Sequence, residues 1–182
     1  MRRMTASFTL VEILIVIVVI AILASITIVS YNGVQSRSRD TKVRVAAKRI
    51  QGALEVFISQ NGRIPKGGAG STQALTNSEC SDGVNGWFGK GTYTCSVEES
   101  LVTANLIPSN LISDLPPNKI SGNLASRVFM LYSCGSSQSI LLWYLESPTA
   151  DDIASYDNSY AVCPGTDWRG LYGMRAATLI DR

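Results

Sequence analysis

The feature that most constrains this chain is an apolar run near its N-terminus, residues 13–29, which read ILIVIVVIAILASITIV. Only Ser25 and Thr27 interrupt it. Extended to residues 8–30 and folded as a helix, the run is about 35 Å long, enough to span the roughly 30 Å hydrocarbon core of a bilayer. A secretory signal peptide has a shorter apolar core followed by a small-residue cleavage site. We therefore expect residues 8–30 to form a transmembrane helix that the mature protein retains.

The helical pattern continues beyond this run, through residues 31–60. Apolar residues recur at steps of three and four and form a stripe along one face. They are Val43, Ala47, Ile50, Leu54 and Phe57. The pair Asn61-Gly62 is typical of a helix end, with glycine as a left-handed cap. The whole helix would be about 80 Å long, with an apolar first half and an amphipathic second half.

The composition excludes several classes of function. The net charge is only +2, so there is no large basic field to attract nucleic acid, and no specific nucleic-acid site is evident. The chain contains no histidine, which removes the commonest general base and the commonest metal ligand. No nucleophile is paired with a base in any recognisable pattern. We expect a protein that is not an enzyme and that needs no cofactor.

Residues 61–182 are enough for one small head domain with its own core. Two apolar segments, residues 127–134 and 139–146, flank a short turn and predict a hairpin. One or two further strands are predicted at residues 159–163 and 173–179, and a short helix is predicted at residues 98–106. The expected fold class is α+β, with the long N-terminal helix packed on a small antiparallel sheet of three to four strands.

Four cysteines, Cys80, Cys95, Cys134 and Cys163, lie in this head domain. None belongs to a C-x-x-C pair, and without histidine a zinc site would need all four at unusual spacings. An even number of cysteines behind a membrane-crossing segment indicates disulfides in an oxidising compartment. Three pairings are possible, and we favour Cys80–Cys95 with Cys134–Cys163 because both are local in sequence.

Asp151, Asp152, Asp157 and Asn158 cluster in a segment that we expect to be a loop. Oxygen-rich loops bind calcium, so these four residues are a weak candidate for a calcium site. Their spacing does not match any calcium-binding loop that we can name. A solvated acidic loop is the favoured interpretation.

Glu12 lies at the edge of the apolar run. A carboxylate at the centre of a membrane costs roughly 2.5–3.5 kcal/mol, and less near the interface. Glu12 therefore either lies at the headgroup level or waits for a partner charge. The residues Ser-Phe-Thr-Leu-Val-Glu, 7–12, followed by ILIVIVVIAILA, resemble the processing site and N-terminal helix of type IV prepilins and related pseudopilins.

The resemblance implies that residues 1–7 are a leader, removed by a prepilin peptidase that cuts between Ser7 and Phe8. The new amine on Phe8 would be methylated, and Glu12 would pair with the terminal amine of a neighbouring subunit. The implied partners are the lipid bilayer, identical or related pilin subunits, the prepilin peptidase and a pilus assembly platform. The sequence departs from the family in having Ser7 where glycine is usual and Val29 where many pilins have proline. A bond such as Cys134–Cys163 would pin the C-terminal segment to a sheet strand, as in many pilins.

By this resemblance the chain is a structural subunit of a type IV pilus, held in the cell membrane by a single span before assembly and in an extracellular surface pilus afterwards. Two alternatives stay open. One is a pseudopilin of a type II secretion or DNA-uptake system. The other, from a different class, is an unassembled single-span membrane protein with an extracytoplasmic binding domain. A positive-inside count of the basic residues in 37–44 would place the head in the cytoplasm, whereas the resemblance and the cysteines favour the opposite side.

Overall fold

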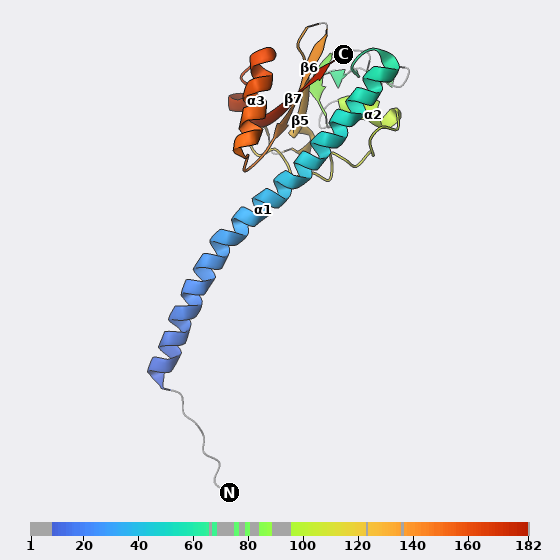
Figure 1. Cartoon of the computed structure of the whole chain (residues 1–182). Helices are drawn as coiled ribbons and strands as arrows, with labels where there is room; N and C mark the ends of the chain where they lie inside the picture. Colours follow the sequence, from blue (N-terminus) through green and yellow to red (C-terminus); the bar gives the residue numbers. More distant parts are fainter. Residues whose placement is uncertain are drawn as a thin grey trace. The chain divides into compact units, whose positions relative to one another are not determined.

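The computed structural model describes residues 9–65, 67–68, 75–76, 79–80, 84–88, 96–122, 124–135 and 137–181. The chain divides into two compact units, Met1–Arg37 and Ser38–Arg182, and helix α1 (Leu10–Asn61) begins in the first and ends in the second (Figure 1). As the sequence predicts, α1 ends at Asn61. Gly62 follows with φ +66° and donates its N–H to the carbonyl of Ile58 at 2.7 Å. Glycine takes this left-handed conformation without steric cost.

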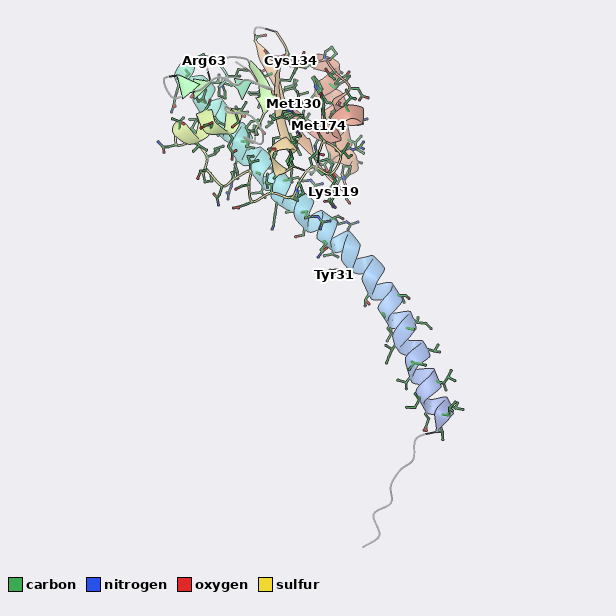
Figure 2. The ribbon with its side chains drawn as sticks, turned by 180° about the vertical axis from the view of Figure 1, so that it is seen from behind. Tyr31, Arg63, Lys119, Met130, Cys134 and Met174 are labelled. Atoms are coloured by element: carbon green, nitrogen blue, oxygen red, sulfur yellow. A yellow bond between two sulfur atoms is a disulfide. The ribbon has the colours of Figure 1, made fainter. Side chains whose placement is uncertain are left out.

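In the first unit, side chains stand out from α1 on all sides (Figure 2). The described apolar residues there are all exposed, from Leu10 at 79% to Val18 at 47%. By length and composition, Leu10–Thr27 is apolar enough to cross a membrane. A helix that is apolar all round needs an apolar environment, either lipid or other protein.

The second unit is built on a sheet whose strand order is β1-β4-β5-β6-β7. The four strands β4 (Val84–Trp87), β5 (Phe129–Ser133), β6 (Gln138–Tyr144) and β7 (Met174–Asp181) pair antiparallel. This confirms the predicted antiparallel sheet and its β5–β6 hairpin. The two-residue strand β1 (Gly67–Gly68) pairs parallel with β4 at the edge, and the sequence did not indicate either of these two strands.

Shorter elements complete the second unit. A separate two-stranded sheet pairs β2 (Leu75–Thr76) with β3 (Glu79–Cys80). Helix α2 (Val97–Thr103) confirms the predicted short helix, and a 3-10 turn η1 (Ala125–Arg127) precedes β5. Between β6 and β7 lie helices α3 (Ala150–Val162) and α4 (Trp168–Tyr172).

The two faces of the sheet carry two apolar clusters, because side chains alternate along each strand. On one face, Phe129, Leu141 and Ala176 pack in the cluster that includes α1. On the other face, Leu142 and Met174 pack with residues of α3 and α4. Met174 and Ala176 are two residues apart and would lie on the same face of a regular strand. They lie on opposite faces because a register irregularity at Trp143/Tyr144 inserts one residue into β7. Figure 1 shows the sheet between α3 and the second half of α1.

The second half of α1 supplies one wall of the core. The predicted stripe is buried throughout, and its members are Val43 (1% exposed), Ala47, Ile50, Leu54 and Phe57. Burial of such side chains contributes about 1.5–3 kcal/mol each. The prediction that the amphipathic half of the helix packs on the sheet is therefore confirmed.

One predicted strand is wrong. Residues 159–163 belong to the end of α3 and to the residue after it, and not to a strand. The buried positions Tyr156, Ser159 and Cys163 are three and four residues apart, which is the period of a helix. A five-residue apolar run is too short to reveal that period. The sequence Thr149-x-x-Asp152 was the available signal, because it forms a complete capping box at the start of α3.

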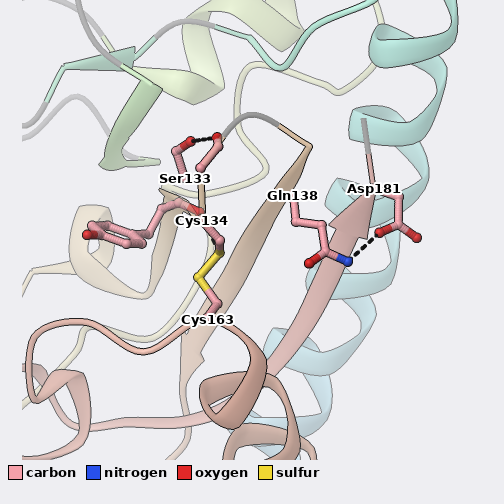
Figure 3. The surroundings of a disulfide bond; sticks show 7 residues. Ser133, Cys134, Gln138, Cys163 and Asp181 are labelled. Atoms are coloured by element: carbon pink, nitrogen blue, oxygen red, sulfur yellow. Dashed lines mark hydrogen bonds between the residues drawn. A yellow bond between two sulfur atoms is a disulfide. The ribbon is translucent and has the colours of Figure 1, made fainter.

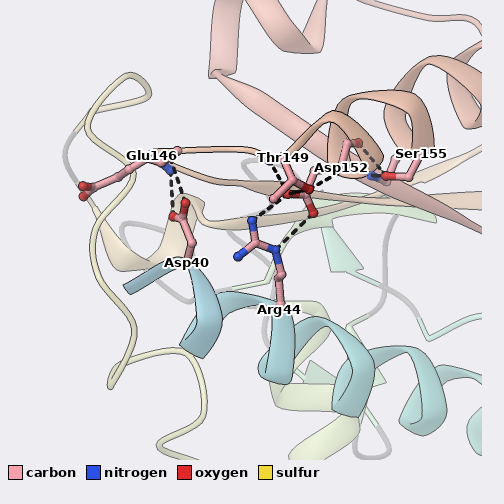
Figure 4. A network of polar contacts seen from close by, with 8 residues as sticks. Asp40, Arg44, Glu146, Thr149, Asp152 and Ser155 are labelled. Atoms are coloured by element: carbon pink, nitrogen blue, oxygen red, sulfur yellow. Dashed lines mark hydrogen bonds and ion pairs between the residues drawn. The ribbon is translucent and has the colours of Figure 1, made fainter. Parts of the chain in front are cut away.

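Polar contacts join α1 to the segment that connects β6 and α3 (Figure 4). Asp40 is 1% exposed, and its two carboxylate oxygens accept the N–H groups of Glu146 and Ser147, each at 2.8 Å. Arg39 donates to Glu146 through two nitrogens, at 3.1 and 2.6 Å. Hydrogen bonds from Arg39 hold the pKa of Glu146 below its usual range.

One turn further along α1, Arg44 donates in the same two-pronged way to Asp152, at 3.1 and 2.6 Å. Asp152 also accepts the backbone N–H and the hydroxyl of Thr149, both at 2.7 Å. Burial by itself would raise the pKa of Asp152, but the bonds from Arg44 and Thr149 lower it overall. The contacts from Arg39, Asp40 and Arg44 therefore fix α1 to the connection after β6 and to the first turn of α3.

Replacing Asp40 with alanine is expected to lower the free energy of unfolding by about 2–4 kcal/mol, because two buried N–H groups lose their acceptor. The measurement is denaturant unfolding of the full chain in detergent. Asp114→Ala is the matched control, because Asp114 is an exposed carboxylate whose loss should cost within about 0.5 kcal/mol. Equal effects of the two substitutions would contradict this account of Asp40.

Candidate assembly site

The first turn of α1 brings Thr9 and Glu12 together. Glu12 Oε2 accepts the backbone N–H and the hydroxyl of Thr9, both at 2.8 Å, while the Thr9 hydroxyl accepts the N–H of Glu12 at 3.2 Å. This reciprocal pattern is a capping box, which satisfies backbone donors that a helix start leaves open. The sequence singled out Glu12 but missed the role of Thr9, although the Thr-x-x-Glu spacing could have indicated it.

Only one oxygen of the Glu12 carboxylate takes part in this capping box. Both bonds from Thr9 end on Oε2, and Oε1 takes part in none of the contacts found among the described residues. The apolar side chains of Leu10, Val11 and Ile13 flank the carboxylate and are exposed. The site is thus one acid with a free oxygen on an apolar helix, which a positively charged group could neutralise. Ser7 and Phe8, the predicted cleavage and methylation positions, lie outside the described residues.

A disulfide joins Cys134 and Cys163, as the sequence predicted (Figure 3). Their Cα atoms are 5.3 Å apart, and the two residues are 29 apart in sequence. Cys134 follows β5, and Cys163 caps the C-terminal end of α3. The bond therefore links the β5–β6 hairpin to the helix on the outer face of the sheet. The other predicted bond, Cys80–Cys95, involves Cys95, which lies outside the described residues.

The candidate calcium residues do not lie in a loop, because all four are part of α3. Asp152 points toward Arg44 and Thr149, and Asp157 pairs with Arg169. Among the residues that the structure describes, no group of three or more His, Cys, Asp or Glu side chains is placed to hold a metal ion. The capping box and the two ion pairs account for the positions of Asp152 and Asp157.

An open pocket of about 580 Å³ lies beside α2 and is named the acidic pocket here. Its lining includes Glu98, Glu99, Val102, Ile112 and Ser113. Glu98 is half-buried and accepts the N–H of Ile112 at 3.4 Å. Burial raises the pKa of Glu98 to about 7. Near neutral pH the charged form of Glu98 is therefore energetically unfavourable, and a nearby cation would stabilise it.

The raised pKa of Glu98 makes stability depend on pH. The folded chain holds this proton more tightly than the unfolded chain, so the free energy of unfolding falls as pH rises from about 4.5 to about 7. Glu98→Gln removes this loss and should stabilise the protein at pH 8 by about 1–2 kcal/mol, after allowance for the partial exposure of the group. At pH 4 the two proteins should unfold alike. An equal difference at pH 4 and pH 8, measured by denaturant unfolding, would contradict this assignment.

The comparison with protein families matches residues 2–28 to the prokaryotic N-terminal methylation motif. The matched residues contain Glu12, Thr9 and most of the apolar half of α1, which form the site described above. This match, over 27 of the 182 residues, supports a relationship to the type IV pilin family. Its α+β fold, with a long apolar N-terminal helix and a four-stranded antiparallel arrangement, is type IV pilin-like.

A curated relative supports the same relationship. It is a protein of Neisseria meningitidis serogroup B (strain ATCC BAA-335 / MC58) that is named Fimbrial protein. The two chains are 28% identical over 123 residues, which is 66% of each. The match thus spans slightly less than two thirds of the relative's length. No solved structure matches the chain significantly. The pilin family is a family of structural proteins and not of enzymes.

Proposed function

We propose that the chain is a structural subunit of a type IV pilus, anchored in the membrane by α1 before assembly and packed into the filament by the same helix. The proposal rests on the part of α1 that lies in the first unit. This part combines an exposed apolar surface with a single acid, Glu12, inside the methylation motif. The printed name of the Neisseria relative, Fimbrial protein, favours a pilus over a secretion system.

The physical argument concerns where this helix can be stable. In the membrane, lipid covers the apolar side chains of residues 10–27. In a filament, the same side chains would pack against those of neighbouring copies, so the transfer replaces one apolar environment by another. Glu12 is the exception, because an unpaired carboxylate in either environment is costly. Pairing with an amine would remove two charges together and fix the axial position of each subunit, since a charged pair fits only one register.

Processing would supply that amine. Removal of residues 1–7 creates a new N-terminus at Phe8, four residues before Glu12, and the amine would be methylated. A copy of the chain displaced along the filament axis could then present its amine to the free oxygen of Glu12. The partners of this function are identical or related pilin subunits, the prepilin peptidase, the pilus assembly platform and the lipid bilayer. The Cys134–Cys163 bond favours a head outside the cytoplasm.

Mass spectrometry of the intact protein recovered from cells tests the proposal first. The expected mature chain begins at Phe8 and carries one methyl group on its amine. A chain that still begins at Met1 would contradict the proposal and favour an unassembled single-span protein. Electron microscopy of the same cells separates the remaining alternatives, because a pilin forms long surface fibres and a pseudopilin forms a short periplasmic assembly.

A further inference from the structure

From Arg39 onward, the cations of α1 fall into two groups. Arg39 and Arg44 face the head and are bound to Glu146 and Asp152. Lys42, Lys48 and Arg49 are exposed, and within the part of the chain that the structure describes they form no ion pair.

The exposed group forms a ridge together with Val45, which is itself 48% exposed. Lys42, Val45 and Lys48 are three positions apart and Arg49 follows Lys48, and all four lie off the buried stripe of α1. Lys42, Val45 and Arg49 also border a groove that the same chain forms with Pro108 and Asp114. This surface, made of Lys42, Val45, Lys48 and Arg49, is named the basic ridge. It offers long side chains whose aliphatic stems and charged ends can both find partners.

The acidic pocket offers the complementary chemistry. Glu98 and Glu99 line the pocket together with apolar residues, here called its apolar floor, that include Val102 and Ile112. A lysine or arginine side chain matches such a site, with its stem on the apolar floor and its charged end on the carboxylates. The ordinary charged state of Glu98 is disfavoured by burial, so an incoming cation would relieve that cost.

The two surfaces lie on either side of one segment. Ser109, Ile112 and Ser113 line the acidic pocket. Their neighbours Pro108, Asn110, Leu111, Asp114 and Leu115 line a groove with Lys42 and Arg49. Both Figure 1 and Figure 2 show α2 beside the second half of α1. A chain that carries two different, complementary surfaces can make a head-to-tail contact with a second copy. Such a contact repeats from copy to copy and generates a helical filament when it does not close into a ring.

We propose that the acidic pocket of one copy receives the basic ridge of a second copy in the filament. This inference rests on the proposed function, because it adds a contact between head domains to the packing of the apolar helices. The occupant is a second copy, because the described part of the chain itself displays three cations that lack an ion pair, and their charge is opposite to that of the pocket.

Charge reversal tests the contact in cells that assemble fibres. Arg49→Glu is expected to reduce the yield of sheared fibres about tenfold, because a like charge then faces the pocket. The second substitution Glu99→Arg in the same chain should restore most of the yield. Asp114→Arg combined with Arg49→Glu is the control, because Asp114 lines the groove and not the acidic pocket, and it should restore nothing. Full yield from Arg49→Glu, or equal rescue by both second substitutions, would overturn the proposal.

Cross-linking keeps the proposal falsifiable if a charge reversal disturbs the head. Arg49→Cys combined with Ser113→Cys should give disulfide-linked ladders from sheared fibres on non-reducing gels. Neither single substitution should do so, and Ser113→Cys with Gln60→Cys is the matched pair outside the ridge. Fibres without the ladder would overturn the contact alone. Absence of fibres from the unchanged chain would overturn the proposed function and this contact with it.

Discussion

Replacing Glu12 with alanine is expected to leave the protein inserted in the membrane and to remove its fibres. Insertion depends on the apolar run of residues 10–27, which the substitution makes slightly more apolar. Assembly would leave the amine of a neighbouring Phe8 without its partner. Breaking a buried charge pair costs roughly 3–5 kcal/mol, which is a factor of more than about 100 for each subunit added. Membrane fractionation and electron microscopy of the same cells measure the two outcomes.

The substitution Glu12→Gln distinguishes the role of the negative charge from the role of the helix cap. A glutamine oxygen can still accept the bonds from Thr9, so the capping box is kept while the negative charge is lost. If charge pairing drives assembly, glutamine and alanine should both abolish fibres. Thr9→Ala should weaken the helix start by about 1 kcal/mol and leave fibres in place, because Glu12 keeps its charge. Normal fibres from Glu12→Gln would show that the cap, and not the charge, is what assembly requires.

Removing the bond between Cys134 and Cys163 is expected to produce the largest loss of stability in the head. The bond closes a loop of 29 residues, for which the chain-entropy model gives roughly 3–4 kcal/mol. For a chain of this size, that corresponds to a fall of about 10 °C in the midpoint of thermal unfolding. The double substitution Cys134→Ala, Cys163→Ala avoids an unpaired thiol. Calorimetry of the protein in detergent measures the change.

The effect should be local to one face of the sheet at first. Cys163 is buried in the cluster of α3 and α4, so loss of the bond frees the end of α3 from the β5–β6 hairpin. Hydrogen exchange should therefore increase in α3 before it increases in the second half of α1, which packs on the opposite face. Equal unfolding midpoints for the parent and the double variant would contradict the assigned role of the bond.

The parts of the fold that the sequence predicted are those with a long, regular pattern. The stripe from Val43 to Phe57 spans four helical turns, and the β5–β6 hairpin has two apolar strands around a Gly-Ser turn. Both are confirmed, because many residues repeat the same signal. The run at 159–163 was misassigned because five residues cannot separate a helix period from a strand period. Strand β4 was missed because it lies in a polar, turn-rich stretch and has only two apolar residues, Val84 and Trp87, which are separated by Asn85 and Gly86.

In the candidate site too, some residues could be predicted from the sequence and others could not. Glu12 is conspicuous because an acid interrupts an apolar surface, whereas Thr9 looks like an ordinary polar residue until its bonds to Glu12 are known. The role of Asp40 could not be predicted, because the N–H groups that it accepts, those of Glu146 and Ser147, lie more than a hundred residues away. Contacts of that range depend on how the whole head folds and leave no trace in the local sequence.

The core of the head also limits where the long helix is able to melt. From Val43 onward, successive turns place buried side chains against the sheet, so unwinding any of them would open the hydrophobic interior. Before Ser38, the helix belongs to a unit of its own, and a methyl group added to Gly33 would meet no neighbour within 4 Å. We therefore expect any stretching or bending of α1 to occur N-terminal to Asp40, where no core side chain of the head has to be exposed.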